Sequence, residues 1–329
     1  MPFAQIAGHR RLLQLTARAA RRGTLPPALV FGGPEGVGKR RAAVALAQIV
    51  NCAAPTEDGD ACGACTSCAR IARGVHPDVF IVEPGDSGSI KIDQVREAIE
   101  RSAYRPFEGR RRVVIVDEAD AMAAEAQNAL LKTLEEPPSS SMFVLVTCRP
   151  DVLLPTVRSR CQRLRFGRLA AADVASVLER DHEYAPDAAR AAAAAADGSV
   201  GRALEGSSEE YTDAREAAAA LLAGVASNAD PRSRMDSARG LAGGAPDREG
   251  LARRLRAAAS ILRDLGILLS RADERGLANA DLKPLLARLS KAFDGDRTLR
   301  AFSAIDRALD ALDRNASPKI VADWVALQL

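Results

Sequence analysis

A glycine-rich stretch at residues 32–41, GGPEGVGKRR, constrains the fold of this 329-residue chain more than any other feature. It contains the pattern G-x-x-x-x-G-K between a short apolar run and a helical pattern. A glycine loop between a strand and a helix points backbone N–H groups inward, where they hold phosphate oxygens at the positive end of the helix. The stretch therefore predicts a parallel-sheet domain with a phosphate-binding loop. The predicted phosphate contacts are Gly33, Gly36, Gly38 and Lys39.

The residue after Lys39 departs from this pattern. A Ser or Thr is expected there, because its hydroxyl ligates the Mg²⁺ of a bound nucleotide triphosphate. Arg40 has no lone pair to offer a metal and brings a fixed positive charge. We therefore expect Mg²⁺-dependent ATP hydrolysis to be crippled at this loop, while the sequence leaves open whether ATP still binds.

The segment 113–120, VVIVDEAD, supplies the other half of a nucleotide site. Asp117 follows a buried strand, where a carboxylate that organises Mg²⁺ belongs, and Glu118 stands where a base for the attacking water belongs. Acids that simply end a strand at the surface are the plainer explanation. The glycine loop in the same domain favours a nucleotide site, although a degenerate one.

Four cysteines lie close together in the sequence as C-x9-C-x2-C-x2-C: Cys52, Cys62, Cys65 and Cys68. Four thiolates complete a tetrahedral Zn²⁺ site and leave no open position, so we expect a structural zinc ion. An iron–sulfur cluster is the alternative, but the usual Cys-Pro ending is missing. His76 is better explained as part of a turn, and we expect Cys148 and Cys161 to be buried apolar residues.

Strands and helices alternate up to residue 166, which predicts a parallel sheet covered on both faces. Within this part, Asp93 is expected to be a helix N-cap. Only helical patterns follow, interrupted at residues 243–246 and 294–296. The predicted class is thus α/β plus all-α, with an α/β domain over 1–166 that includes the cysteine module (52–68), a helical lid over 167–207 and a helical domain over 208–329.

Composition excludes some classes. The net charge of +3 is too small to indicate nucleic-acid binding by itself. No apolar run approaches the roughly 20 residues that span a bilayer, and the amino-terminal residues have no apolar core of a secretory signal. We therefore expect a cytoplasmic protein without membrane contact.

Several segments together resemble one family. They are the glycine loop, the four-cysteine insertion, HPDVFIVEP, IKIDQVREAIE, VVIVDEADAM, QNALLKTLEEPP and LLPTVRSRCQ. In this order they are similar to the subunits of the bacterial DNA polymerase III clamp loader, and within it to the delta-prime family. The resemblance is close over about residues 1–205. It implies an AAA+ domain, a helical lid and a C-terminal collar domain that oligomerises.

The resemblance also implies roles. Ser159-Arg160-Cys161 matches the family's SRC motif, so Arg160 would be an arginine finger that reaches a neighbouring subunit's ATP site. Arg202 matches the sensor 2 position and Thr147 lies near sensor 1, which adds both to the degenerate nucleotide site. The implied partners are the delta and gamma/tau subunits in a hetero-pentamer, with the sliding clamp and primed DNA reached through the complex. We expect no independent ATPase activity.

Two alternatives stay open. The gamma/tau motor subunit of the same loader shares the zinc module and the LEEPP segment, but it requires a hydroxyl after the loop lysine. A stand-alone AAA+ ATPase, such as a helicase loader, would have to hydrolyse ATP by itself and has no need of the zinc module.

Overall fold

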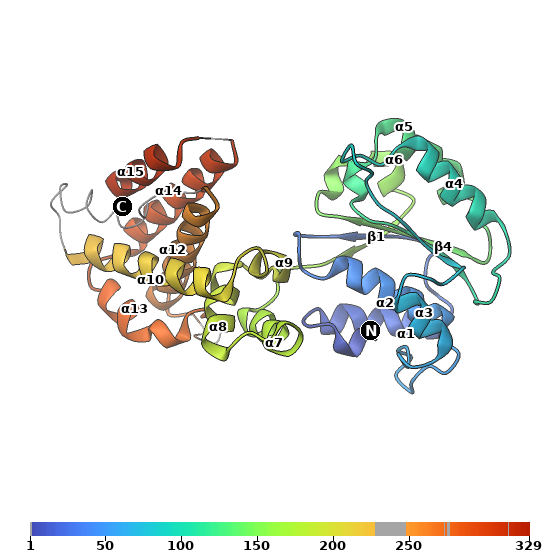
Figure 1. The fold of residues 1–329 in the computed structure, drawn as a ribbon, viewed down its shortest axis with the longest axis horizontal. Helices are drawn as coiled ribbons and strands as arrows, with labels where there is room; N and C mark the ends of the chain where they lie inside the picture. The colour runs from blue at the N-terminus through green and yellow to red at the C-terminus, as the bar shows by residue number, and fades with distance from the viewer. Residues whose placement is uncertain (1, 228–247, 273, 275–276, 315) are drawn as a thin grey trace. The chain divides into compact units, whose positions relative to one another are not determined.

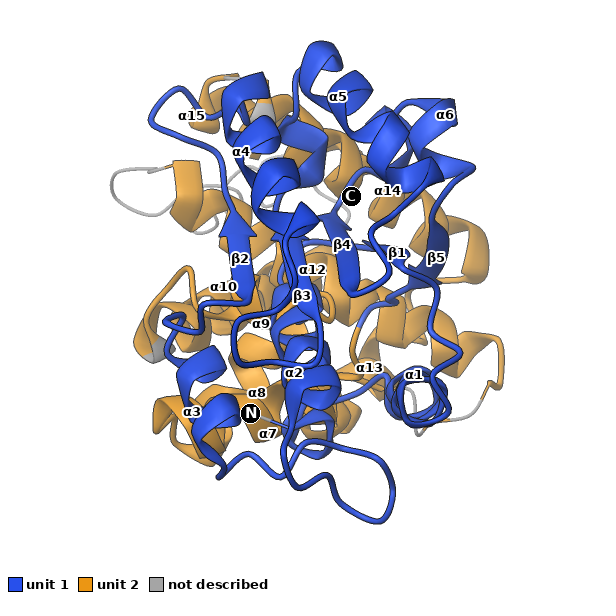
Figure 2. Cartoon of the chain, turned by 90° about the vertical axis from the view of Figure 1, so that its right-hand side faces the viewer, with its two compact units in different colours: residues 1–168 blue, residues 169–329 orange. Residues whose placement is uncertain are grey.

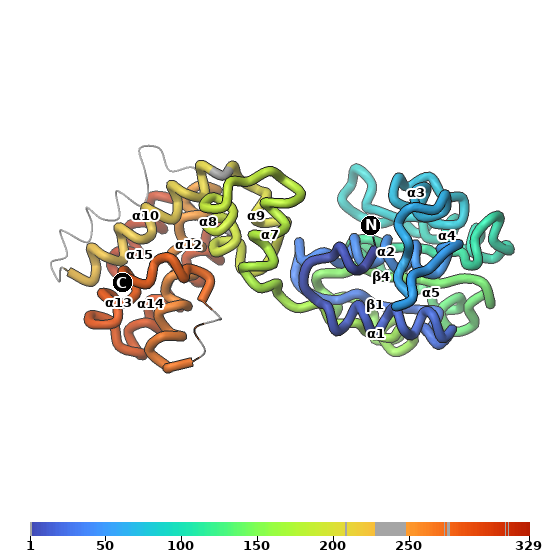
Figure 3. The backbone as a smooth tube through the Cα atoms, turned by 90° about the horizontal axis from the view of Figure 1, so that it is seen from below, coloured from blue at the N-terminus to red at the C-terminus, as the bar shows by residue number. Residues whose placement is uncertain are grey.

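The structure is a computed structural model that describes residues 2–227, 248–272, 274, 277–314 and 316–329. The chain divides into two compact units, residues 1–168 and 169–329, coloured separately in Figure 2. Each unit is one continuous stretch of chain, as the colour order along the tube in Figure 3 shows.

The first unit is built on a five-stranded parallel sheet with the strand order β2-β3-β4-β1-β5. The strands are β1 (Ala28–Gly32), β2 (Val79–Val82), β3 (Arg112–Val116), β4 (Ser141–Thr147) and β5 (Gln162–Arg165). Parallel strands need crossover connections, and helices supply them here. Because all strands run the same way, the sheet has one edge of carboxyl ends and one edge of amino ends.

Helices cover both faces of this sheet. Figure 1 shows α1, α2 and α3 on one face, and α4, α5 and α6 on the other. Their bounds are α1 (Arg10–Arg21), α2 (Lys39–Asn51), α3 (Thr66–Ala72), α4 (Ile92–Ala103), α5 (Ala124–Glu135) and α6 (Pro155–Arg158). Short 3-10 turns complete the unit at Phe3–Gln5, Ala119–Ala121 and Pro150–Val152.

The three central strands are buried on both faces, which explains their continuous apolar runs. In β3, Val113 and Ile115 are as fully buried as Val114 and Val116, although alternate residues face opposite sides. Val114 and Val116 belong to one core cluster with residues of α4, α5 and α6. The predicted sheet with helices on both faces is therefore confirmed.

One local prediction is wrong. Helix α4 begins at Ile92 with Lys91 at its N-cap, so Asp93 lies inside the first turn. The side chain of Gln94 accepts a hydrogen bond from the Lys91 backbone N–H at 2.9 Å and satisfies the helix start. An aspartate in the first turn still interacts favourably with the helix dipole, which is why it resembled a cap in the sequence.

The second unit is helical throughout its described residues. Its helices are α7 (Ala171–His182), α8 (Pro186–Ala195), α9 (Val200–Ala203), α10 (Ser208–Ser227), α12 (Arg248–Leu269), α13 (Lys283–Leu289), α14 (Gly295–Asp313) and α15 (Pro318–Gln328), with a 3-10 turn at Ala280–Leu282. These bounds confirm the α/β plus all-α class. Among the described residues, no helix is both long and apolar enough to cross a membrane.

The alanine run of α8 has a packing role. Residues 191–195 are all buried, and α8 lies against α7, α10 and α12. Small side chains let helix backbones approach closely at such a crossing. The division into lid (167–207) and collar (208–329) stays a prediction, and the predicted interruption at 243–246 lies outside the described residues.

Candidate functional site

The predicted glycine loop leaves β1 at the carboxyl edge of the sheet and enters α2. Gly36 and Gly38 have left-handed backbones with φ of 69° and 91°, which only glycine adopts without strain. A Cβ on Gly33 would lie 2.1 Å from the carbonyl oxygen of Phe166, so close packing against the end of β5 demands a glycine there. The strand–loop–helix arrangement is confirmed, and each glycine also has a structural reason to be present.

Lys39 folds back onto its own loop. Its Nζ donates to the carbonyl oxygen of Gly33 at 2.8 Å and also to that of Pro34. The residue is only 7% exposed, and burial lowers the pKa of Lys39, against the opposing effect of Cys148 and Asp117. The lysine that would hold nucleotide phosphates is hydrogen-bonded to the loop itself in this structure.

Arg40 pairs with two acids at the same edge. Its Nη1 lies 3.3 Å from Oδ2 of Asp117, which follows β3, and its Nη2 contacts Glu83, which follows β2. Burial raises the pKa of Asp117, and the Arg40 guanidinium is the strongest opposing influence. The sequence reasoning missed Glu83, although β2 and β3 are neighbours and their carboxyl ends must therefore lie side by side. A guanidinium thus contacts the carboxylate that was expected to organise Mg²⁺.

Thr147 and Glu118, the other predicted residues of this edge, differ in their surroundings. Thr147 ends β4, and its hydroxyl donates to Oδ1 of Asp120 at 2.7 Å. Asp120 also accepts from Arg149 Nε at 2.9 Å. Burial works against ionisation of Asp120, but these partners outweigh it and lower its pKa. Glu118 is exposed, with a left-handed φ of 48°.

Cys148 corrects an expectation. It was expected to be buried, but it is exposed, and its thiol donates to Oδ2 of Asp120 at 3.4 Å. Partial burial of the thiol and the Asp120 carboxylate raise the pKa of Cys148. Strand β4 ends one residue earlier, so Cys148 has already left the sheet.

The Ser159-Arg160-Cys161 segment lies at the opposite, amino edge, just before β5. Ser159 Oγ donates to the carbonyl oxygen of Thr156 in α6. Cys161 is buried in the core as expected, and burial raises its pKa to about 11. Arg160 contacts Glu135, the last residue of α5. The strand register places Gln162 opposite Leu29, four residues before the loop glycine Gly33. At roughly 3.3 Å per strand residue, about 13 Å therefore separates the two edges here.

Arg202 belongs to the second unit. It lies in α9, where its backbone N–H donates to Ser199 Oγ at 3.1 Å and its carbonyl oxygen accepts from the Tyr211 hydroxyl. These contacts fix the short helix. The role of Arg202 toward a nucleotide stays a prediction.

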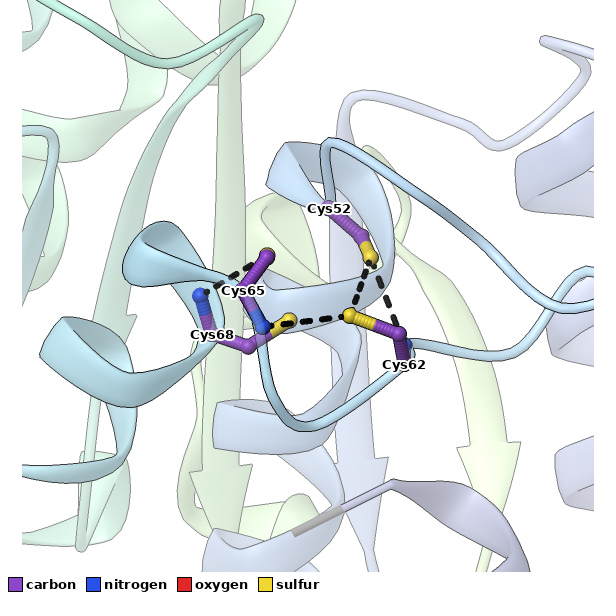
Figure 4. A group of neighbouring side chains, drawn as sticks. All are labelled: Cys52, Cys62, Cys65 and Cys68. Atoms are coloured by element: carbon purple, nitrogen blue, oxygen red, sulfur yellow. Dashed lines mark hydrogen bonds between the residues drawn. The ribbon is translucent and has the colours of Figure 1, made fainter.

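The four cysteines do come together, as Figure 4 shows. Their sulfur atoms all lie within 4.8 Å of one another, and Cys52 and Cys62 are 3.5 Å apart. Four sulfurs at 2.3 Å from a tetrahedral zinc ion would be separated by about 3.8 Å, so the donor set fits such an ion. Burial opposes ionisation of Cys65, but the backbone N–H of Cys68 and other donors outweigh it and lower the pKa of Cys65 to about 6. The cluster is a candidate metal centre with four protein ligands.

Two buried polar residues that the sequence did not reveal, Asp78 and Asn51, hold the loop 107–111 beside this cluster. The carboxylate of Asp78 is fully buried and accepts hydrogen bonds from the backbone N–H groups of Phe107, Glu108 and Gly109, at 2.7 to 2.9 Å. Asn51 directly precedes Cys52. Its Oδ1 accepts two further hydrogen bonds, from the backbone N–H groups of Arg110 and Arg111. These bonds hold a loop on which Phe107 is 81% exposed.

The helix α3 of the cysteine module also reaches this loop. Arg70 Nη1 lies 2.6 Å from a carboxylate oxygen of Glu108. His76 is buried in the predicted turn, and its Nδ1 accepts from the Asp78 backbone N–H at 3.1 Å, so Nε2 carries the proton shared with Ser67. The module and the loop 107–111 therefore form one connected structure at the amino edge.

Comparison with known proteins identifies the first unit. The family described as "DNA polymerase III, delta subunit" matches residues 8–170. Residues 8–170 belong to the clamp-loader subunits of DNA polymerase III. The matched range includes the glycine loop, the cysteine cluster and Arg160.

The curated relatives that the chain matches include subunits of DNA polymerase III. A DNA polymerase III subunit delta' of Pseudomonas aeruginosa is 42% identical over 135 residues, which cover 41% of this chain and 41% of the relative. A subunit gamma/tau of Mycobacterium bovis is 36% identical over 179 residues, covering 54% and 31%. The chain thus spans less than half the length of either relative. A solved gamma subunit-related protein of Thermotoga maritima aligns with 96% of this chain and 98% of its own, at 18% identity and a TM-score of 0.42.

The predicted site residues thus lie in three places. The carboxyl edge holds the glycine loop, Asp117, Glu118 and Thr147. The amino edge holds Arg160 and the cysteine cluster, and the second unit holds Arg202. Among the residues that sequence reasoning missed, Glu83 and Glu135 are partners of predicted ones, while Asp78 and Asn51 hold the loop 107–111.

Proposed function

We propose that this chain is the delta-prime subunit of the DNA polymerase III clamp loader, a subunit that does not hydrolyse ATP itself. The observation that carries the proposal is the contact of Arg40 with Asp117 and Glu83. A motor subunit needs a hydroxyl at this position and a carboxylate available to Mg²⁺. In this chain Arg40 stands at the position of the hydroxyl, and its guanidinium contacts the carboxylate of Asp117.

The charge of Arg40 supports the proposal that this site does not hold Mg²⁺ for hydrolysis. A fixed guanidinium beside Asp117 already neutralises the acid, so a divalent cation entering the site would gain less from it and would be repelled by Arg40. Lys39, which is hydrogen-bonded to Gly33 and Pro34, would also have to change partners before it could hold a phosphate. Thr147 and Arg202, at the predicted sensor positions, would then have no hydrolysis to report in this subunit.

The second part of the proposal concerns Arg160. It lies at the amino edge, about 13 Å along the strands from the chain's own glycine loop. This separation supports a role toward a neighbouring subunit, where the guanidinium would stabilise the charge that develops on the γ-phosphate. Arg160 would then be an arginine finger in trans, completing a site that another subunit provides.

The four cysteines are proposed to hold a structural zinc ion. Their sulfur separation fits one ion, and four thiolate ligands leave no position for substrate. The proposed partners are the delta and gamma/tau subunits in a hetero-pentamer. The sliding clamp and primed DNA would be reached through that complex, in the cytoplasm.

The gamma/tau motor subunit is the second candidate. The observations that favour it are the retained Lys39, Asp117 and Glu118 and the 36% identity to a gamma/tau relative. Against it stand Arg40 and the contacts of Arg40 and Lys39 described above. A stand-alone AAA+ ATPase is supported by no contact among the described residues.

Two measurements test the proposal. The isolated chain should hydrolyse ATP no faster than background, and a loader assembled with its delta and gamma/tau partners should lose DNA-stimulated ATPase when Arg160 is replaced by Ala. Turnover by the isolated chain would point to the motor subunit. Unchanged activity of the assembled Arg160→Ala loader would overturn the finger assignment.

A further inference from the structure

Glu135 holds the guanidinium of Arg160 from one side. Nε of Arg160 donates to Oε1 of Glu135 at 2.8 Å, and Nη2 donates to the same oxygen. Nη1 donates to the carbonyl oxygen of Thr156 at 2.9 Å. Two segments therefore fix this side chain: the end of α5 and helix α6.

The three hydrogen bonds of Arg160 use only some of the N–H donors of its guanidinium. Arginine has five N–H donors in a planar fork. Glu135 takes the side edge formed by Nε and Nη2, and Thr156 takes one donor of Nη1. One N–H on Nη1 and one on Nη2 remain, and two such donors match the bidentate geometry that suits a phosphate.

The pair is also placed where it can be reached. The Arg160 side chain is 31% exposed and that of Glu135 is 49% exposed. A long arginine side chain at such a surface would otherwise sample many rotamers, and ordering it on binding would cost conformational entropy. A carboxylate that holds it beforehand removes part of that cost.

We propose that Glu135 is a positioning residue that aims Arg160 at the neighbouring subunit's nucleotide. This inference rests on the proposed function, because it needs Arg160 to act in trans. Glu135 itself does not touch the nucleotide. It keeps the plane of the guanidinium fixed, so the end of the fork is ready when the subunits meet.

The contact geometry gives a sharp test. Both donors of Arg160 go to one oxygen of Glu135, and an amide in Glu135→Gln keeps such an oxygen while losing the charge. Glu135→Ala removes the acceptor altogether. Glu136, the adjacent exposed glutamate, provides the matched control as Glu136→Ala. Each variant would be assembled into the loader with its delta and gamma/tau partners, with assembly and the melting temperature measured alongside.

We expect Glu135→Ala to lower the kcat of DNA-stimulated ATP hydrolysis about ten-fold, since misplacing a catalytic group by about 1 Å costs up to 10²-fold. KM for ATP should stay unchanged, because the finger acts on the transition state. Glu135→Gln should stay within about two-fold of the unaltered chain, since an oxygen acceptor remains. Glu136→Ala should behave like the unaltered chain.

Several results would overturn the inference. One is a full rate for Glu135→Ala while Arg160→Ala is impaired, which would leave the finger assignment intact. Another is an equal loss in Glu135→Gln and Glu135→Ala, which would mean that charge and not aim matters. A loss that follows a lowered melting temperature would show a role in folding only. If Arg160→Ala itself has no effect, the proposed finger fails first and the role of Glu135 fails with it.

Discussion

The two edges of the sheet carry similar groups but use them differently. At the carboxyl edge, Lys39 and Arg40 are bound to loop carbonyls and to acids within the same site. At the amino edge, buried Asp78 holds the backbone of the loop that carries exposed Phe107, and the exposed Glu135 holds Arg160 at the surface. The first arrangement neutralises a site from within, while the second presents groups outward.

The difference in burial shows what each ion pair can do. The Asp117 side chain is 13% exposed, so Arg40 is paired with a mostly buried carboxylate. Glu135 is far more exposed, and surface pairs of this kind contribute only about 0–1 kcal/mol to stability. A pair that adds little to stability is better explained by the geometry that it imposes on Arg160.

The largest expected effect comes from removing metal at the amino edge. The purified chain should contain one zinc ion, and a strong chelator should lower the free energy of unfolding by several kcal/mol, because metal binding is coupled to folding. Hydrogen exchange should accelerate in residues 52–76 and in the loop 107–111, which Arg70 and Asn51 join to the module. The interior strand β1 serves as the internal control. A chain without bound metal, or an unchanged exchange pattern, would contradict the assignment.

Asp78→Asn should cost about 3 kcal/mol, since a buried acceptor of three backbone N–H groups is weakened. Burial works against ionisation of Asp78, but the three N–H groups outweigh it and lower its pKa. The charged form therefore stabilises the fold at pH values above the ordinary aspartate pKa of about 4, and that stabilisation is lost as pH falls through the lowered folded pKa. Denaturant unfolding from pH 7 to pH 2 measures this, and the exposed Asp86→Asn is the control. A stability difference that does not shrink at low pH would show that the charge is irrelevant.

At the carboxyl edge, Arg40→Thr should restore the missing hydroxyl and free Asp117. We expect binding of a fluorescent ATP analogue to become at least about ten-fold tighter in the presence of Mg²⁺, a gain of about 1.4 kcal/mol. Arg41→Thr, at the adjacent exposed position, should leave binding unchanged. Equal affinity in both variants would mean that Arg40 does not close the site.

The smallest expected effect concerns the thiol at Cys148. In the zinc-loaded chain an alkylating reagent should modify Cys148 faster than the buried Cys161. Because the pKa of Cys148 is raised, its reaction should be slow at pH 7 and quicken as pH rises. Asp120→Asn removes a charge that raises this pKa and should speed the reaction at pH 8 roughly two- to three-fold. A slower reaction in that variant would contradict the proposed influence of Asp120.

Much of the first unit followed from local patterns in the sequence. Strand β3 ends at Val116, directly before Asp117 as predicted, because a buried parallel strand is continuously apolar. The cysteine spacing likewise predicted a cluster, because three-residue steps bring thiols together. The contact partners were not predictable in this way. Glu83 and Glu135 look like ordinary surface acids, and only the strand order and the helix ends bring them to Arg40 and Arg160.

Two errors have the same physical origin. Cys148 was expected to be buried, but strand β4 ends at Thr147 and Cys148 is exposed. Asp93 looked like a helix cap, but the helix had already begun. Both residues lie within two positions of an element boundary, where short patterns carry little information.

The close packing of Gly33 against the Phe166 carbonyl limits which residues of the loop can change during evolution. Any side chain at this position would collide with the backbone that leaves β5, whether or not a nucleotide is ever present. Position 40, at the start of a half-exposed helix face, is under no such steric demand. A lineage can therefore abandon the chemistry at one residue while architecture alone preserves the neighbouring motif. Resemblance of such a loop to active counterparts is therefore no evidence by itself of present use.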